Sequence, residues 1–408
     1  MAQRNKLKIF NDPIYGFIGT PNELIYNLIG HPFFQRLRRI SQMGLSYIVY
    51  PGAHHTRFHH ALGSMHLMVQ AIRVLRFKKV EITEEEEMGL LVAILLHDIG
   101  HGPFSHALEF SLVENVSHES LSLRLIEKLN EEFDGALTMA IAIFKGEHPK
   151  RFLNQLVSSQ LDTDRLDYLK RDSFYTGVTE GNISSERIIT MLNVQDDELV
   201  VEEKGIYSVE KFLMARRFMY WQVYLHKTSL VAEQLLLKLI KRSKLLLQEG
   251  HELECAAALK YFLTRNGADR FDESTLLQFV LLDDVDIISA LKTWQFHDDF
   301  VLSKLSGMLL NRNLLEIRIK NNPIADEKMR KKRNWVKSSY GLRDGEADYF
   351  VFSGEISNRA YNADYQNINI ARKSGKLTDV ANASDHLNLK ALSKKVTKYY
   401  VCYPKESV

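Results

Sequence analysis

Hydrophobic residues recur at helical spacing through about the first three quarters of the chain, and this pattern predicts a mainly α-helical protein. An extended segment, KIFNDPIYGFI, precedes the first helix. Thr83 followed by Glu84 to Glu87 is typical of a helix start, because threonine caps free N–H groups and acidic residues favour the positive end of the helix dipole. Helices are expected over residues 21–44, 61–78, 84–100, 117–133, 135–144 and 150–171, with long helices within 207–245 and further helices within 252–310.

Two parts of the chain depart from this helical pattern. The stretch NVQDDELVVEEKGIYSV, between two helical regions, predicts a β-hairpin. Beyond residue 310, alternating, β-branched and aromatic residues predict strands in LLEIRI, ADYFVFSG, QNINIA and KKVTKYYVCY. We therefore expect a catalytic core over 1–245 with an N-terminal extended segment and an inserted hairpin, a helical extension over 246–310, and a small α+β lobe over 311–408.

The composition is that of an ordinary globular protein. The chain has 408 residues, of which 45% are hydrophobic and 25% charged, and this length predicts two or three lobes. MAQRNKLKIF lacks the apolar stretch of a signal peptide, and no apolar run approaches the length that spans a bilayer. The only two cysteines, Cys255 and Cys402, lie far apart, which suits a reducing compartment. We expect a cytoplasmic protein without a membrane partner.

A basic run, KMRKKRNWVK (328–337), raises the question of nucleic-acid binding, with Trp335 as a stacking residue. The formal net charge is only +2, so no large positive field supports such binding. We expect this run to be a linker into the C-terminal lobe or an oligomer contact, and we expect no nucleic-acid partner.

The segment LLHDIGHGPFSH places a histidine and an aspartate, His97 and Asp98, at the end of an apolar helix. Such residues seldom lie beside buried aliphatic side chains unless something pairs with them. His60 upstream and Asp164 downstream complete a set of two imidazoles and two carboxylates, which suits one divalent ion of Mn, Fe, Mg, Zn or Ni. The alternative is that the pair only caps a helix whose end Gly100 marks.

The segment QLDTDRLDYLKRD predicts a helix with two chemically rich faces. At 3.6 residues per turn, one face holds Asp164, Asp167, Tyr168 and Arg171, and an overlapping face holds Arg165, Tyr168 and Asp172. Such a face offers a metal carboxylate with a tyrosine and an arginine beside it. The alternative for this segment alone is a charged surface helix with intrahelical ion pairs.

The order of these motifs resembles the HD-domain phosphohydrolases, which implies an HD-domain helical bundle. KIFNDPI, HPFFQRLRRISQMG, YPGAHHTRFHHALG, HDIGHGPFSHALE, SHES and LDTDRLDYLKRD follow the HD-domain dNTP triphosphohydrolases in order, over about residues 7–245. That group includes the animal sterile-alpha-motif/HD-domain dNTPase and bacterial relatives. The resemblance implies hydrolysis of a dNTP, in which water attacks the α-phosphorus to give a deoxynucleoside and tripolyphosphate.

The same resemblance implies roles for individual side chains. It assigns metal ligation to His60, His97, Asp98 and Asp164. It makes His118 the catalytic histidine, oriented by Glu109 where the animal enzyme has aspartate, with His106 and Arg57 as phosphate contacts. For His101, His106 and His118 the alternative is a helix-capping or satisfied core histidine.

Substrate selection is implied by a further set of matching positions. Gln42 resembles the residue that reads the sugar 3′-hydroxyl, and Met43, a leucine in the animal enzyme, would exclude a ribose 2′-hydroxyl sterically. The other implied contacts to phosphates and sugar are Arg165, Tyr168, Asp172, Arg216 and Tyr224. Leu225 stands where the animal enzyme has a glutamine near the base, so the base preference does not follow from the resemblance.

The resemblance also extends to a nucleotide effector site at a subunit interface. The matching positions are Lys8, Asn11, Gln35, Arg38, Lys204, His226 and Lys227. Gly30 replaces an aspartate that reads guanine, and Glu202 replaces an arginine that contacts phosphate. We expect an effector site of altered specificity, or a vestigial one, in a homo-oligomer (dimer or tetramer). The alternative is that Lys8, Gln35 and Arg38 serve folding alone.

Two further functions are compatible with the sequence. One is an HD-domain phosphohydrolase acting on another nucleotide or phosphoester. The other is a non-catalytic nucleotide- or nucleic-acid-binding protein on the same scaffold, which would be expected to have lost metal ligands. All four ligand positions are occupied here, so the enzyme is the favoured prediction.

Overall fold

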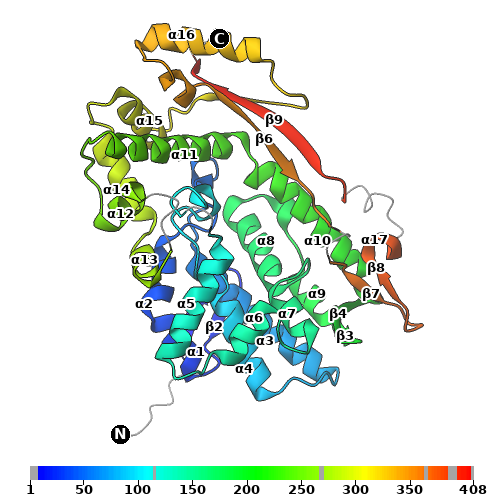
Figure 1. Ribbon diagram of the computed structural model, residues 1–408. Coiled ribbons are helices and arrows are strands. Elements are labelled where there is room, and N and C mark those ends of the chain that lie inside the picture. The colour runs from blue at the N-terminus through cyan, green and yellow to red at the C-terminus, as the bar shows by residue number, and fades with distance from the viewer. Residues whose placement is uncertain (1–7, 114–115, 266–270, 363–365, 385–392, 406–408) are drawn as a thin grey trace.

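Helices dominate the structure, as the hydrophobic pattern predicts. The computed structural model describes residues 8–113, 116–265, 271–362, 366–384 and 393–405. Figure 1 shows a helical body with small sheets along one flank and with the helix α16 (Asp326–Tyr340) at one end. This confirms the predicted mainly α fold with a small C-terminal portion that contains sheet.

The centre of the body is formed by α3 (Arg57–Phe77), α4 (Glu84–Leu96) and α8 (Thr163–Thr176), with α3 packed against both of the others. Every residue of α4 from Gly89 to Leu96 is buried, which explains its uniformly apolar sequence. Thr83 and Glu86 form the capping box at the start of α4, as expected. Around this centre lie α5 (His118–Glu132), α6 (Thr138–Lys145), α7 (Arg151–Val157) and α9 (Ser185–Met191).

The approach of α3 to α8 depends on Gly63. A Cβ atom at this position would lie 2.1 Å from Asp167 Oδ1 and 2.2 Å from Arg171 Nη2. Both partners are fully buried and joined in an ion pair, so neither can move away cheaply. Gly63 therefore allows α8 to lie close to the α3 residue His60.

Substitution of Gly63 by alanine is expected to destabilise the protein by about 1–3 kcal/mol, the usual cost of inserting a methyl group into a packed interior. Gly307, within α15 (Phe300–Leu310), is the matched control because a Cβ there meets nothing within 4 Å. Gly307→Ala should stabilise by about 0.5–1 kcal/mol through helix propensity. Urea unfolding curves of the two variants measure both values, and equal midpoints would contradict this account.

Two expected helices are interrupted, each for a local reason. The segment 21–44 divides into α1 (Glu23–Gly30), α2 (Pro32–Gln35) and a 3₁₀ turn over Arg36–Arg39, because His31 precedes proline and has extended backbone. The segment 150–171 divides into α7 and α8, because the Asp162 side chain accepts from Arg165 N and caps a new helix.

Residues 207–245 contain the expected long helices, with an irregular turn between them. This region contains α10 (Ile206–Met219), a π-helical turn over Tyr220–Tyr224, and α11 (Lys227–Gln248). A π-helical turn is rare and often accompanies a functional site. The expected helices of 252–310 are α12 (Ala257–Thr264), α13 (Glu273–Phe279), α14 (Asp284–Trp294) and α15, while residues 266–270 lie outside the described part of the chain.

Within the described part of the chain, the strands form three small sheets. At the entry of the chain, β1 (Ile9–Asp12) pairs with β2 (Gly16–Gly19). The predicted hairpin is β3 (Leu192–Gln195) and β4 (Glu198–Glu202), and β4 pairs in parallel with β7 (Asn369–Ala371), which pairs with β8 (Leu377–Asp379). In Figure 1, β6 (Phe352–Asn358) and β9 (Val396–Tyr403) run side by side, and β9 also pairs with β5 (Glu316–Lys320). The short helix α17 (Val380–Ala383) follows β8.

The basic run 328–337 lies in α16 (Asp326–Tyr340), so the expectation of a linker is wrong. The side chains of Met329 and Val336 in this helix are buried. The Lys332 ammonium lies 3.5 Å from the Tyr403 ring centroid. Among the described residues, no helix is both long and apolar enough to cross a membrane.

Candidate active site

Three helix ends bring the predicted metal ligands together. His60 lies in the first turn of α3, His97 and Asp98 follow the last residue of α4, and Asp164 lies in the first turn of α8. The Nε2 atoms of His60 and His97 are 3.3 Å apart, and Asp164 Oδ1 lies 3.0 and 3.6 Å from them. Asp98 Oδ2 lies 3.5 Å from His60 Nε2, and Asp98 Oδ1 lies 3.5 Å from His97 Nε2. The ligand atoms of His60, His97 and Asp164 therefore converge, with Asp98 beside them, from residues up to about a hundred positions apart.

The orientation of the two imidazoles fits a metal site. His97 Nδ1 lies 2.7 Å from the Ile94 carbonyl oxygen, which can only accept, so this nitrogen carries the proton. His60 Nδ1 lies 2.8 Å from Asp167 Oδ2. With both Nδ1 atoms hydrogen-bonded to acceptors, both Nε2 atoms face the site, as in histidines that hold metals. The mixed nitrogen and oxygen donor set accommodates a divalent ion.

Asp167 is a site residue that the sequence analysis placed on the right helix face without giving it a role. Its carboxylate binds His60 on one side and the Arg171 guanidinium on the other, and Arg171 also contacts Asp12 Oδ2 at 2.7 Å. Burial alone would lower the pKa of His60, but its hydrogen bonds to Asp164 and Asp167 outweigh this and raise the pKa to about 10. The sequence signal for this role is the i, i+3 spacing of Asp167 from Asp164, which places both carboxylates on one face of α8.

Replacement of Asp167 by asparagine is expected to weaken divalent-metal binding about 10- to 100-fold, because the partner that orients a ligating histidine contributes this much to affinity. Calorimetric titration of metal-stripped protein with Mn²⁺ measures the change without any assay of activity. Asp12→Asn is the control, since Asp12 reaches Arg171 but not His60. Equal affinities of the Asp167→Asn and unmodified proteins would contradict the orienting role.

Arg57 connects the metal ligands to the loop that follows them. Its Nη1 lies 2.5 Å from Asp98 Oδ2, and its Nε donates to Ser105 Oγ at 2.9 Å. Burial would raise the pKa of Asp98, but the Arg57 charge outweighs it and holds the pKa well below the usual value. Arg57 lines the cavity while its charge is already shared with a ligand carboxylate.

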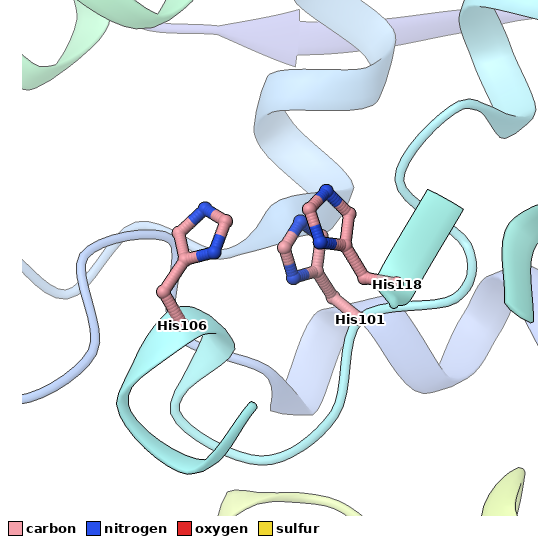
Figure 2. A group of neighbouring side chains, drawn as sticks. All are labelled: His101, His106 and His118. Atoms are coloured by element: carbon pink, nitrogen blue, oxygen red, sulfur yellow. The ribbon is translucent and has the colours of Figure 1, made fainter. Parts of the chain in front are cut away.

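Three histidines lie together beyond the metal ligands, as Figure 2 shows: His101 on the loop after α4, His106 on the 3₁₀ turn Ser105–Leu108, and His118 at the start of α5. One carboxylate holds two of them, since Glu109 lies 2.6 Å from His118 Nδ1 and 2.8 Å from His106 Nδ1. The Glu109 position therefore fits its expected orienting role. His101 Nε2 lies 3.3 Å from Asp98 Oδ1.

The nitrogen atoms of these three rings are near enough for a metal, but their orientation is not suited to one. The His101 and His118 rings are stacked, with centroids 4.0 Å apart and planes inclined by 19°. Lone pairs of stacked rings run parallel and do not converge on one ion. An anion is a better match, because N–H groups can donate to several oxygens of a phosphate.

A cavity of about 580 Å³ is lined both by candidate metal ligands and by the three histidines. Of the predicted substrate contacts, Gln42, Met43, Arg165, Tyr168, Asp172 and Tyr224 line it. The Tyr224 hydroxyl donates to Asp172 Oδ2 at 2.7 Å, and Gln42 Oε1 is buried without a partner in the described structure. Arg216 is not among the lining residues: its Nη1 donates to the Ala360 carbonyl, and its guanidinium lies 5.8 Å from the Tyr220 ring centroid.

Arg36 and Asp284 hold the histidine loop in place, and sequence patterns gave neither a role. The Arg36 guanidinium is fully buried and donates to the carbonyls of Ile99, His101 and Leu282. Asp284, the first residue of α14, accepts from Phe104 N at 2.6 Å and from Ser41 N at 2.8 Å. Both residues connect the loop to the region of α13 and α14. These contacts join segments that are far apart in the sequence, so a sequence pattern does not predict them.

The predicted effector residues occupy three places. Lys8 lies beside the Tyr26 ring and Asn11 is in β1. Gln35 is the last residue of α2, and Arg38 lies in the following 3₁₀ turn with its guanidinium 3.6 Å from the Phe58 ring centroid. Lys204 follows β4, and His226 and Lys227 begin α11. Binding of an effector nucleotide by these residues stays a prediction.

Comparisons with known proteins agree with this architecture. Residues 57–172 match the HD domain, and residues 183–260 match the HD associated region. The uncharacterized protein YwfO of Bacillus subtilis is 34% identical over 76% of this chain and 71% of its own. The crystal structure of a phosphohydrolase from Bacteroides thetaiotaomicron has a TM-score of 0.94 and 51% identity, covering 98% of this chain and 100% of that chain.

A relative with a described activity matches the same region. The deoxynucleoside triphosphate triphosphohydrolase SAMHD1 homolog of Dictyostelium discoideum is 33% identical over 56% of this chain. The match spans 48% of that protein, so the chain corresponds to about half of it.

Proposed function

Because the chain belongs to the dNTPase-like family of HD-domain phosphohydrolases, we propose that it is a metal-dependent deoxynucleoside triphosphate triphosphohydrolase. The observation that carries this proposal is the convergence of two imidazole Nε2 atoms and two carboxylates beside a cavity of about 580 Å³. In the proposed reaction water adds to the α-phosphorus and the bond from this phosphorus to O5′ breaks. The products are a deoxynucleoside and tripolyphosphate.

One divalent ion of Mn, Fe, Mg, Zn or Ni, held by His60, His97, Asp98 and Asp164, would polarise a phosphoryl oxygen and lower the pKa of a bound water. Asp167 orients the His60 imidazole, and Arg57 keeps the Asp98 carboxylate ionised. Since both partners are buried, the ligand geometry is fixed before substrate binds.

His118 is the proposed proton donor to the departing O5′. Burial would lower its pKa, but the hydrogen bond to Glu109 outweighs burial and raises the pKa above the ordinary value. A raised pKa keeps a histidine protonated up to a higher pH, and the protonated form can donate to an alkoxide leaving group. Arg57 and His106 are proposed to hold phosphate oxygens beside it.

The sugar is proposed to lie against Gln42, Met43, Tyr168, Asp172 and Tyr224. Gln42 Oε1 supports this, because a buried acceptor without a partner is available to a hydroxyl of the sugar. Arg165, which lines the cavity, is proposed to bind phosphate, whereas Arg216 does not line the cavity. We also propose a nucleotide effector site of altered specificity in a homo-oligomer.

The test is hydrolysis of each dNTP, singly and as a mixture, and of GTP, with Mn²⁺ present. Turnover of dNTPs but not of GTP supports the proposal, and activity only in mixtures supports an operating effector site. If none of the dNTPs is hydrolysed with any divalent ion, while another phosphoester is, the substrate assignment is wrong.

A further inference from the structure

His55 is a buried histidine that has no role in the arrangement described above. Its Nε2 atom lies 2.7 Å from Asp172 Oδ1. Because a carboxylate oxygen accepts, Nε2 is the donor in this hydrogen bond. Within the described residues, His55 Nδ1 is buried and has no hydrogen-bond partner, so the bond to Asp172 is the only one that the ring forms.

The His55 ring is held in place by the last turn of α8. It is stacked on the Tyr175 ring, with centroids 4.4 Å apart and planes inclined by 15°. Gly52 allows the loop before α3 to come this close, because a Cβ atom there would lie 2.6 Å from the Tyr175 carbonyl oxygen. The stacked ring keeps its Nε2 atom at Asp172, which lies one turn earlier in α8.

Both oxygens of the Asp172 carboxylate accept from side chains that are fixed in this way. Oδ1 accepts from His55, and Oδ2 accepts from the Tyr224 hydroxyl at 2.7 Å. These two bonds fix the plane of the carboxylate, while each oxygen keeps capacity for a further donor. Because Asp172 also lines the cavity, it is an acceptor that is oriented before substrate binds.

The position of Asp172 along α8 points to the sugar as the source of that donor. Asp164, Tyr168 and Asp172 follow one another at i, i+4 spacing on one face of α8, and all three line the cavity. The candidate metal ligand Asp164 stands at one end of this row, where the α-phosphate is proposed to react. In a dNTP the sugar follows the α-phosphate, and the 3′-hydroxyl is the only hydroxyl of this sugar.

His55 also contacts the backbone of a second residue that is proposed to hold the sugar. Its carbonyl oxygen accepts from Gln42 N at 3.0 Å, and Gln42 Oε1 is the buried acceptor without a partner among the described residues. His55 therefore connects Gln42 with Asp172. We propose that His55 is a positioning residue, which orients the Asp172 carboxylate to accept the 3′-hydroxyl of the substrate. This inference rests on the proposed dNTP hydrolysis.

The experiment adds dTTP and its 3′-deoxy analogue ddTTP, at equal concentrations, to a mixture of the other dNTPs with Mn²⁺. Because both nucleotides compete for the same enzyme, the ratio of their initial rates equals the ratio of their kcat/KM values, whatever fraction of the protein is folded or activated. The unmodified protein should prefer dTTP by about 100-fold or more, since a site built to bind a hydroxyl rejects the analogue that lacks it.

His55→Phe keeps an aromatic ring beside Tyr175 but loses the donor to Asp172. It should lower the preference for dTTP by about tenfold or more, the usual contribution of a hydrogen bond to a charged group. His55→Gln places an amide N–H near the position of Nε2 and should retain most of the preference. His54→Phe, at the exposed neighbouring position, is the control and should leave the ratio unchanged. His55→Leu also lacks the donor and repeats the test if His55→Phe does not fold.

A purely structural role for His55 predicts less folded protein but an unchanged ratio of dTTP to ddTTP hydrolysis. An unchanged ratio in the variants without the donor would therefore overturn the inference. So would a His55→Gln variant that loses the preference as fully as His55→Phe, or an unmodified protein that hydrolyses both nucleotides alike. All three results leave dNTP hydrolysis intact. If the unmodified protein hydrolyses none of the dNTPs in the mixture, the proposed function itself fails, so the two failures are distinguishable.

Discussion

Replacing Asp98 with alanine is expected to lower kcat/KM by about 10³-fold or more, because a metal ligand acts on the charge that develops at the phosphorus. Asp98 faces both ligand imidazoles and also pairs with Arg57. Its removal leaves the buried Arg57 charge without a partner, so some loss of stability accompanies the loss of turnover. Asp98→Asn keeps the volume and one acceptor, and it should be nearly as inactive while unfolding closer to the unmodified protein.

The measurements are steady-state hydrolysis with saturating Mn²⁺ and far-UV circular dichroism of each variant. Asp298→Ala, at an exposed position, is the control and should keep both the activity and the helical signal. A folded Asp98→Asn protein with full activity would show that the metal assignment is wrong.

Loss of His118 is expected to reduce kcat by about 10²- to 10⁴-fold, the usual contribution of a positioned general acid. The active form is protonated, and Glu109 raises the pKa of His118 above its ordinary value. Activity should therefore be retained below this raised pKa and lost as the pH rises through it. Glu109→Gln removes the carboxylate, so the alkaline limb of the pH–rate profile should move to lower pH.

The direction of this movement separates catalysis from a structural role. Glu119→Gln is the matched control. Glu119 is exposed, and its Oε1 lies 3.3 Å from His118 Nε2, whereas Glu109 Oε1 lies only 2.6 Å from His118 Nδ1. Glu119→Gln should shift the profile less. An alkaline limb that stays in place in Glu109→Gln would contradict the assignment of His118 as the proton donor.

Local patterns were sufficient to predict the helical class and the candidate metal ligands. The apolar run before His97 and the capping sequence at Thr83 are local signals, and both describe α4 correctly. The four candidate ligands were named from residue chemistry and family resemblance, and the fold brings them together from three helices. The assignment of their roles remains the proposal that the experiments above address.

The helix boundaries, the strand pairing and some side-chain roles depend on contacts that a sequence pattern does not contain. Periodicity continues across residues 158–162, yet the Asp162 side chain caps a new helix there. The parallel pairing of β4 with β7 joins segments more than 160 residues apart. Asp167 was on the expected helix face, but its contact with His60 Nδ1 is set by the packing of α8 against α3. Arg216, expected to bind phosphate, lies outside the cavity lining because its guanidinium reaches the Ala360 carbonyl.

The most direct test of the proposed function is identification of the products from one dNTP incubated with purified protein and Mn²⁺. Phosphorus NMR distinguishes tripolyphosphate from pyrophosphate, and chromatography distinguishes the deoxynucleoside from its monophosphate. Cleavage between the α-phosphorus and O5′ should give only tripolyphosphate and the deoxynucleoside. Release of pyrophosphate and a deoxynucleoside monophosphate would place the cleavage at a different bond and contradict the proposed reaction.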